Sequence, residues 1–218
     1  MAIPFNYIKA KPHLGVNSIL ADQIYIVDGF FSPADLRAVL TWAQSLELEG
    51  PKKAGRGEAE RTGSRASLQS PEIASELLRL ILPHLPALSP PYTAKAALSP
   101  NIRVYHYPAH TFFGQHYDMP QLDPASRRQS CWTVLIYLAD GVKGGSTIFY
   151  PHENDRRKGR KNAKSGGQKG QEEKIVIEPK AGRMLLHWHG VSGGGCIRHE
   201  GEVVVSGDKW VLRTDVLA

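Results

Sequence analysis

The chain has 218 residues, of which 41% are hydrophobic, and a formal net charge of +6, so it is long enough for one domain with a sizeable core. Its two cysteines, Cys131 and Cys196, exclude both a disulfide framework and a Cys-x-x-Cys motif. The start of the chain lacks the features of a signal peptide, and no run approaches the roughly twenty apolar residues that span a bilayer. We therefore expect a cytoplasmic or nuclear protein that is not secreted and has no membrane partner. The composition leaves its oligomeric state open.

Two helices are predicted in the first hundred residues. Ser32, Pro33 and Asp35 form a helix start, with a capping serine, a proline at the first position and an acid at the third. Apolar residues then recur at helical spacing, at Leu36, Val39, Leu40, Ala43 and Leu46. A second helix begins after Ser70 and ends near Pro83. We expect residues 1–100 to be a helical support region that packs on one face of a sheet.

The remainder of the chain reads as strands. Residues 132–138, 144–149, 175–177, 182–186 and 209–213 are apolar or alternating segments. Because side chains alternate along a strand, Thr133, Leu135 and Tyr137 should share one face.

Residues His116, Asp118 and His199 carry the most specific chemical pattern. In an extended segment, His116 and Asp118 point to the same side and can hold one ion, while His199 must come from another strand. Two imidazoles and one carboxylate on one side of a metal leave its other side open, as in non-heme Fe(II) oxygenases. Lys209 follows His199 by ten residues and can bind a carboxylate.

In these motifs, residues 103–217 resemble the prolyl 4-hydroxylase-like branch of the 2-oxoglutarate- and Fe(II)-dependent dioxygenases. The resemblance includes Tyr107, which lies nine residues before His116, the strand at 132–138, the Gly-Gly-Ser-Thr-Ile-Phe segment at 144–149, and His199 followed by Lys209 and Trp210. It implies a mainly β fold with supporting helices: a double-stranded β-helix, or jelly roll, with the N-terminal helices packed on one face. We expect a single domain, 1–218, whose core is residues 101–218.

The resemblance also implies roles for individual residues. Fe(II) would be bound by His116, Asp118 and His199, with O2 and 2-oxoglutarate as co-substrates and ascorbate in support. The 2-oxoglutarate pocket would be formed by Tyr107, Thr133, Leu135, Tyr137 and Lys209. No further catalytic residue is expected beyond the metal site.

Two alternatives remain for these roles. Arg213 shares a face with Lys209 by period two and offers a planar, bidentate fork, so it competes for the distal carboxylate of 2-oxoglutarate. His187 and His189 also alternate and could form a three-histidine zinc site with His199. A zinc site of three histidines would leave the carboxylate of Asp118 and the cation of Lys209 without a role. We therefore expect His187 and His189 to lie around the metal site or near the substrate.

The excess positive charge lies in one segment. Between residues 156 and 174, eight basic residues stand against Glu172 and Glu173, a net +6 that equals the charge of the whole chain. The segment lacks large apolar residues, so we expect a mobile basic loop at 151–174. It could attract an acidic substrate, close over the site, or be only a solvated insertion. It has no interleaved aromatic residues to stack bases, which disfavours nucleic acid as a partner.

The sequence thus predicts an Fe(II)- and 2-oxoglutarate-dependent dioxygenase that hydroxylates an unactivated C–H bond and releases succinate and CO2. Its substrate would be a prolyl or other residue of a peptide or protein, or an amino-acid-like small molecule. The alternatives are oxidation of another small metabolite, demethylation of nucleic acid, and a metal-binding protein without catalysis.

Overall fold

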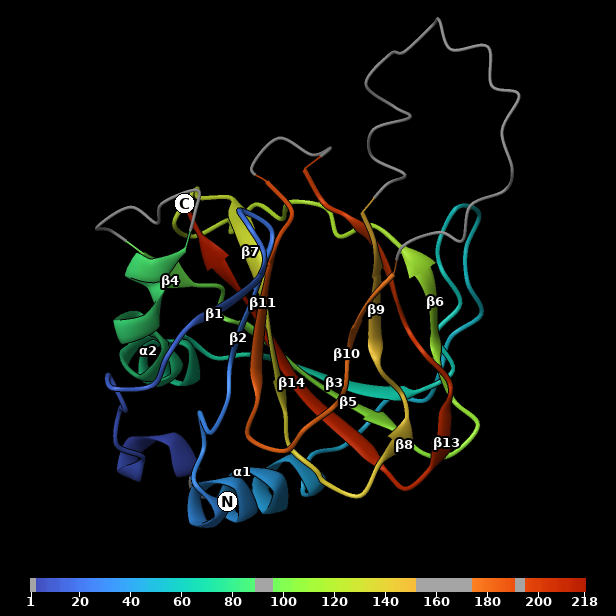
Figure 1. Ribbon diagram of the computed structural model, residues 1–218, viewed down its shortest axis with the longest axis horizontal. Helices are drawn as coiled ribbons and strands as arrows, with labels where there is room; N and C mark the ends of the chain where they lie inside the picture. Colours follow the sequence, from blue (N-terminus) through green and yellow to red (C-terminus); the bar gives the residue numbers. More distant parts are fainter. Residues whose placement is uncertain (1–2, 89–95, 152–173, 191–194) are drawn as a thin grey trace, which may run out of the picture.

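The computed structural model describes residues 3–88, 96–151, 174–190 and 195–218. Most of the expected basic loop, residues 152–173, lies outside this part of the chain. Two antiparallel sheets face each other across the middle of the molecule, and helices lie on the outer side of the larger sheet (Figure 1). The predicted mainly β fold with helices on one face is confirmed.

The larger sheet has eight strands in the order β1-β2-β11-β7-β14-β5-β3, with β4 also paired to β14. Its strands are β1 (Asn17–Leu20), β2 (Ile24–Val27), β3 (Ser64–Gln69), β4 (Ala97–Leu98), β5 (Asn101–Tyr107), β7 (Ser130–Tyr137), β11 (Met184–Trp188) and β14 (Lys209–Leu217). The smaller sheet has the order β10-β9-β12-β6. It consists of β6 (Phe113–His116), β9 (Thr147–Tyr150), β10 (Ile175–Ile177) and β12 (Arg198–Gly201), and a separate pair joins β8 (Lys143–Gly144) to β13 (Val204–Ser206).

The two predicted helices are confirmed as α1 (Pro33–Gln44) and α2 (Pro71–Ile81). At α1 the Ser32 hydroxyl accepts from the Asp35 amide, and the Asp35 carboxylate accepts from the Ser32 amide. At α2 the Ser70 hydroxyl accepts from the amide of Ile73. Short 3-10 helices also form, η1 (Pro4–Tyr7) near the chain start and η2 (Leu82–Ala87) directly after α2. None of the described helices is long and apolar enough to cross a membrane.

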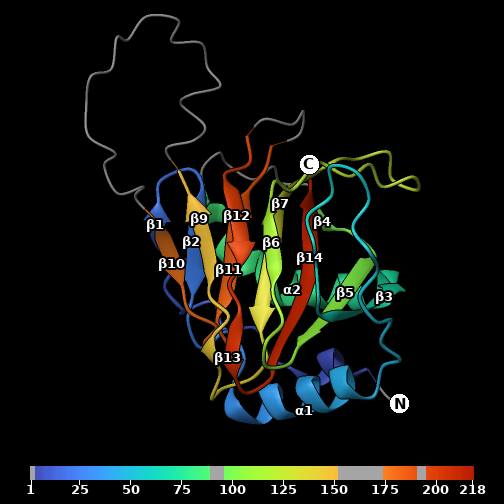
Figure 2. The ribbon, with the colours of Figure 1, turned by 90° about the vertical axis from the view of Figure 1, so that its right-hand side faces the viewer.

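The description of residues 1–100 as helical support is incomplete. Strands β1 to β4 lie in this region, and β2 and β3 pair with the core strands β11 and β5. Sequence periodicity missed β1 and β3 because β1 is largely exposed and β3 buries only one residue fully, so neither presents a regular apolar face. β2 is buried at all four positions, but so short an apolar run does not by periodicity distinguish a strand from a helix. The N-terminal region therefore completes the large sheet as well as covering it (Figure 2).

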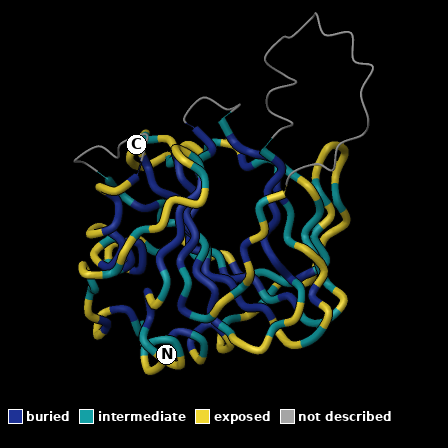
Figure 3. The backbone as a smooth tube through the Cα atoms, in the orientation of Figure 1, coloured by how far each residue is buried: buried dark blue, intermediate teal, exposed yellow. Residues whose placement is uncertain are grey.

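Strand alternation divides the core into two layers. On β7, Val134 and Ile136 belong to the cluster that packs against the helices, whereas Leu135 and Tyr137 pack with the cluster between the sheets. Figure 3 shows the buried strands around the space between the sheets. The inner layer is therefore where side chains from the two sheets meet.

Candidate active site

A pocket lies between the two sheets and contains most of the residues that the sequence singled out. It encloses about 550 Å³ of empty space, counted with its open mouth. Its lining includes Tyr107, His116, Asp118, Leu135, Tyr137, His187, His199, Lys209 and Arg213. These side chains come from both sheets, so the pocket exists only when the sheets face each other.

The three predicted metal ligands converge at one end of this pocket. His116 ends β6 and is paired across the sheet with His199 of β12, while Asp118 follows two residues later. One ligand atom from each residue lies within 4.8 Å of the other two. The Nε2 atoms of His116 and His199 are each 3.8 Å from a carboxylate oxygen of Asp118. This spacing allows one ion to contact all three residues.

Backbone carbonyls orient both imidazoles toward that ion. The Nδ1 of His116 donates to the Gly114 carbonyl at 2.8 Å, and the Nδ1 of His199 donates to the Ile197 carbonyl at 2.9 Å. A carbonyl only accepts, so Nδ1 carries the proton and Nε2 presents a lone pair. Metal-binding histidines in proteins are commonly oriented in this way. The donor set therefore fits a divalent iron with open positions.

The ionisation of the three residues also suits metal binding. Burial and the neighbouring His199 lower the pKa of His116 to about 4. Burial also lowers the pKa of His199, so both rings are neutral at pH 7. Burial alone would raise the pKa of Asp118, but Arg213 and the adjacent imidazoles outweigh it and hold that pKa well below its usual range. No proton must be removed from these groups before a metal binds at neutral pH.

Asp118 is held by donors from the large sheet. Its Oδ2 accepts from the Thr133 hydroxyl at 2.8 Å and lies 3.0 Å from the Arg213 guanidinium. Arg213 also contacts Asp215 at 3.4 Å. Thr133 was expected to line the 2-oxoglutarate pocket, but the structure places its hydroxyl on the carboxylate of Asp118.

Lys209 lies at the other end of the pocket. Its ammonium donates to the Gly145 carbonyl at 2.6 Å and lies 5.5 and 5.7 Å from the ring centroids of Tyr107 and Tyr137. Burial lowers its pKa to about 8. None of the ion pairs found among the described residues involves Lys209, whereas Arg213 already pairs with two carboxylates. This arrangement favours Lys209 over Arg213 for an incoming carboxylate.

The remaining predicted pocket residues lie between these two ends. Leu135 lines the pocket, as does Tyr137, whose hydroxyl shares a hydrogen bond of 2.7 Å with that of Thr147. Burial raises the pKa of Tyr137 to about 12, so it remains a neutral phenol that can donate. The sequence alone gives Thr147 no separate role, although its place two residues before the buried Phe149 puts both on one strand face.

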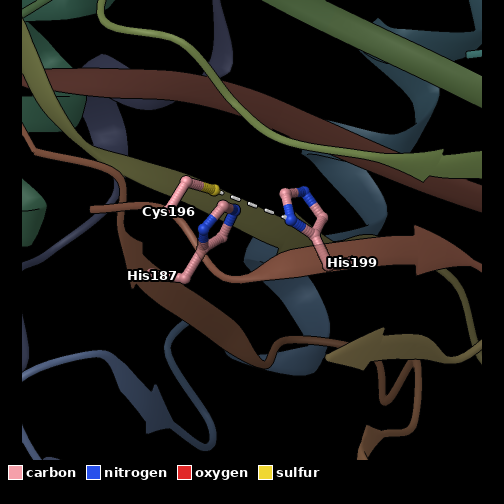
Figure 4. Close-up of side chains that lie close together, drawn as sticks. All are labelled: His187, Cys196 and His199. Atoms are coloured by element: carbon pink, nitrogen blue, oxygen red, sulfur yellow. Dashed lines mark hydrogen bonds between the residues drawn. The ribbon is translucent and has the colours of Figure 1, made fainter. Parts of the chain in front are cut away.

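A second group of possible ligands, His187, Cys196 and His199, adjoins the first (Figure 4). Its use would require a Cys196 thiolate, but burial raises the pKa of this thiol to about 12. It would also engage the Nδ1 of His199, which donates to a carbonyl and lies 3.8 Å from the Cys196 sulfur. Cys196 instead accepts a hydrogen bond from the Asp118 amide at 3.2 Å, which helps to position that ligand.

The three-histidine zinc site weighed from the sequence does not form among the described residues. His187 is buried in the pocket wall, with Nε2 3.4 Å from Asp118. His189 instead turns its Nδ1 to the Gly190 carbonyl and belongs to neither group of possible ligands.

Comparison with known proteins agrees with this geometry. The family model described as the 2OG-Fe(II) oxygenase superfamily matches residues 102–214, which is 113 of the 218 residues. No curated protein sequence matches the chain significantly.

Solved structures of prolyl hydroxylases share the fold at low sequence identity. A viral collagen prolyl hydroxylase from Paramecium Bursaria Chlorella virus-1 is 17% identical, with a TM-score of 0.60 over 90% of this chain and 96% of that one. A prolyl hydroxylase from Trichoplax adhaerens, in complex with a hypoxia inducible factor peptide fragment, is 19% identical, with a TM-score of 0.61 over 90% and 84%. A Pseudomonas putida prolyl-4-hydroxylase is 15% identical, with a TM-score of 0.57 over 90% and 92%. Since the family model covers more than half of the chain, the chain belongs to the 2OG-Fe(II) oxygenase superfamily and is a dioxygenase.

Proposed function

We propose that the protein binds Fe(II) through His116, Asp118 and His199 and hydroxylates a C–H bond of a prolyl or other residue in a peptide or protein. The observation that carries this proposal is that the two ends of the pocket differ in chemistry. Three atoms that could bind a metal lie together at one end, and the buried ammonium of Lys209 lies at the other. A molecule with a keto acid at one end and a carboxylate at the other complements both.

The chain's own residues position the co-substrate. Lys209 holds the distal carboxylate of 2-oxoglutarate, and the phenol of Tyr137 is placed to donate to the same group. Leu135 and Val211 form apolar walls that exclude water between the two ends. When bound, Fe(II) supplies the activation of O2 that couples decarboxylation of 2-oxoglutarate to oxidation of the substrate.

A peptide substrate is favoured by the surroundings of His116. Its side chain is 14% exposed, and it lines an open groove as well as the pocket. An extended chain in this groove could present one residue to the metal. The Trichoplax relative was solved with a peptide fragment, which adds support at the level of the fold. An amino-acid-like molecule or another small metabolite remains the second candidate, because most residues that line the inner pocket are buried.

The test is succinate formation from 2-oxoglutarate with Fe(II) and air, using a panel of proline-containing peptides and free amino acids. The wild type should form succinate, and one substrate class should increase the rate and gain one oxygen atom by mass spectrometry. His199→Ala should be inactive, whereas His13→Ala, which alters an exposed histidine, should match the wild type. Omitting ascorbate should shorten the active lifetime if it supports turnover. Equal succinate formation by wild type and His199→Ala would contradict the proposal.

A further inference from the structure

A basic groove adjoins the active-site pocket. It is lined by residues of the 52–65 segment on one side and of 113–119 on the other: Lys52, Lys53, Ala54, Gly57, Glu58, Ala59, Arg61, Arg65, Phe113, Gln115, His116, Tyr117 and Met119. Phe113 and His116 line both the groove and the pocket. A molecule in the groove therefore lies directly beside a predicted metal ligand.

The charge of the groove is one-sided. Four cationic side chains stand against the single carboxylate of Glu58, which gives a net +3 for the lining. Outside the lining, Glu49 pairs with Lys52 at 3.0 Å and also interacts electrostatically with Arg65 and Arg61, so counting its carboxylate reduces the net charge at the groove to +2. None of the charges named above belongs to residues 152–173.

One wall of the groove, the 60–62 segment, is held by hydrogen bonds to the β6 region, which carries His116. The backbone amide of Gly114 donates to the Glu60 carbonyl at 2.8 Å, and the amide of Thr62 donates to the Phe112 carbonyl at 3.0 Å. β6 is the edge strand of the smaller sheet, so these bonds fix the 60–62 segment along its outer side. Arg61 and Arg65 thus have a defined place relative to His116.

The groove lining contains two aromatic residues, Phe113 and Tyr117, and the first of them is already engaged. The Phe113 ring already stacks on the His116 ring at 3.9 Å between centroids. The lining also contains Met119, which is 59% exposed, and two alanines. A mixed apolar and cationic surface suits a peptide with acidic side chains better than a nucleic acid, whose binding without sequence preference uses stacking platforms.

We propose that this basic groove binds acidic residues that flank the oxidised residue of a peptide substrate. The proposal rests on the proposed hydroxylase function and narrows its substrate class. Charge complementarity at an open groove gives specificity and faster association more than tight binding. The preference should therefore be moderate and sensitive to salt.

The test measures binding apart from turnover. Two fluorescent peptides with the same central proline, one flanked by glutamates and one by glutamines, are titrated with Mn(II)-loaded protein and 2-oxoglutarate while anisotropy is recorded. The glutamate peptide should bind about threefold to tenfold more tightly. The double variant Lys52→Gln/Lys53→Gln should remove most of this difference, and Lys9→Gln, at an exposed lysine outside the groove, should leave it unchanged.

Equal affinity for the two peptides would overturn the proposal, and so would an equal effect of Lys9→Gln. An oligonucleotide that binds more tightly than the acidic peptide, through the same two lysines, would overturn it in favour of nucleic acid. Succinate formation with the panel of peptides and amino acids separates the two claims. If it occurs while the charge preference is absent, the groove assignment fails alone; if it is absent with every candidate substrate, the hydroxylase function fails.

Discussion

The ammonium group of Lys209 is buried, and none of the ion pairs among the described residues gives it a carboxylate partner. Its side chain is almost fully buried, and burial lowers its pKa to about 8 because the ammonium loses solvation. Holding such a charge costs folding free energy, which a functional residue recovers only when an anion binds. We therefore propose that Lys209 is the residue that binds the distal carboxylate of 2-oxoglutarate.

Lys209→Met should therefore weaken 2-oxoglutarate binding by about 30-fold to 1000-fold, which corresponds to roughly 2–4 kcal/mol. The unfolding free energy should not fall, because methionine fills similar space without a buried charge. Calorimetric titration of the Mn(II)-loaded protein measures the first effect and thermal unfolding the second. An unchanged affinity for 2-oxoglutarate would assign the carboxylate to another residue, with Arg213 the first to test.

The same pKa predicts how 2-oxoglutarate binding depends on pH. The protonated ammonium binds the carboxylate, and in the ligand-free protein it loses its proton as pH rises through about 8. The affinity should be constant below this pH and fall by up to about tenfold per pH unit above it. Titrations of the Mn(II)-loaded protein between pH 6.5 and 9.5 test this. A flat profile across the range would show that Lys209 does not carry the interaction.

Arg213 balances the charge of Asp118 when no metal is bound. Replacing it with methionine leaves a buried carboxylate without its cation, so Arg213→Met should lower the unfolding free energy of the metal-free protein by about 3–5 kcal/mol. A metal ion can supply the missing positive charge, so Mn(II) should raise the melting temperature more in this variant than in the wild type. Arg213→Lys keeps the charge and is the matched control. Equal metal-induced shifts in all three proteins would rule out this role.

At the scale of elements, α1 is fixed by its capping box and packs Val39, Trp42 and Ala43 into the core. Ser32→Ala removes the hydroxyl that accepts from the Asp35 amide, and should lower the unfolding free energy by about 0.5–2 kcal/mol. The affinity for 2-oxoglutarate should be unchanged, because α1 lies on the far side of the large sheet from the pocket (Figure 1). A stable variant with altered 2-oxoglutarate affinity would contradict this separation.

Which side chains of one strand share a face of the site could be predicted from the sequence of that strand alone, because side chains alternate along it. Lys209 and Arg213 were expected on one face, and both line the pocket together with Val211. The partner that each cation meets could not be predicted, because it depends on register between distant strands. Arg213 pairs with Leu135 across β7, which brings it beside Thr133 and Asp118 rather than toward Lys209's end of the pocket.

The groove beside His116 could be only partly anticipated from the sequence. Arg61 and Arg65 belong to the polar segment 51–67, from which they could either reach the mouth of the site or be merely exposed. Their place depends on the 60–62 segment lying along β6, more than fifty residues later. Strands β1 and β3 were missed for a similar reason. Their pairing partners, not their own apolar pattern, decide that they are strands.

At the scale of the whole molecule, residues 1–100 and 101–218 share one sheet, and we propose that they form a single domain. The two sheets bring His116 and His199 together on the smaller one and support Asp118 from the larger one. The site should therefore be lost on unfolding and restored only with the whole fold. Metal binding reports on this assembly directly.

The central claim is that His116, Asp118 and His199 hold the metal, and titration with Mn(II), a redox-stable substitute for Fe(II), tests it most directly. We predict one ion per wild-type chain, greatly weakened binding in His116→Ala and Asp118→Ala, and full binding in Cys196→Ser. Full binding in His116→Ala together with its loss in Cys196→Ser would contradict the account, and would assign the metal to the neighbouring group that contains Cys196.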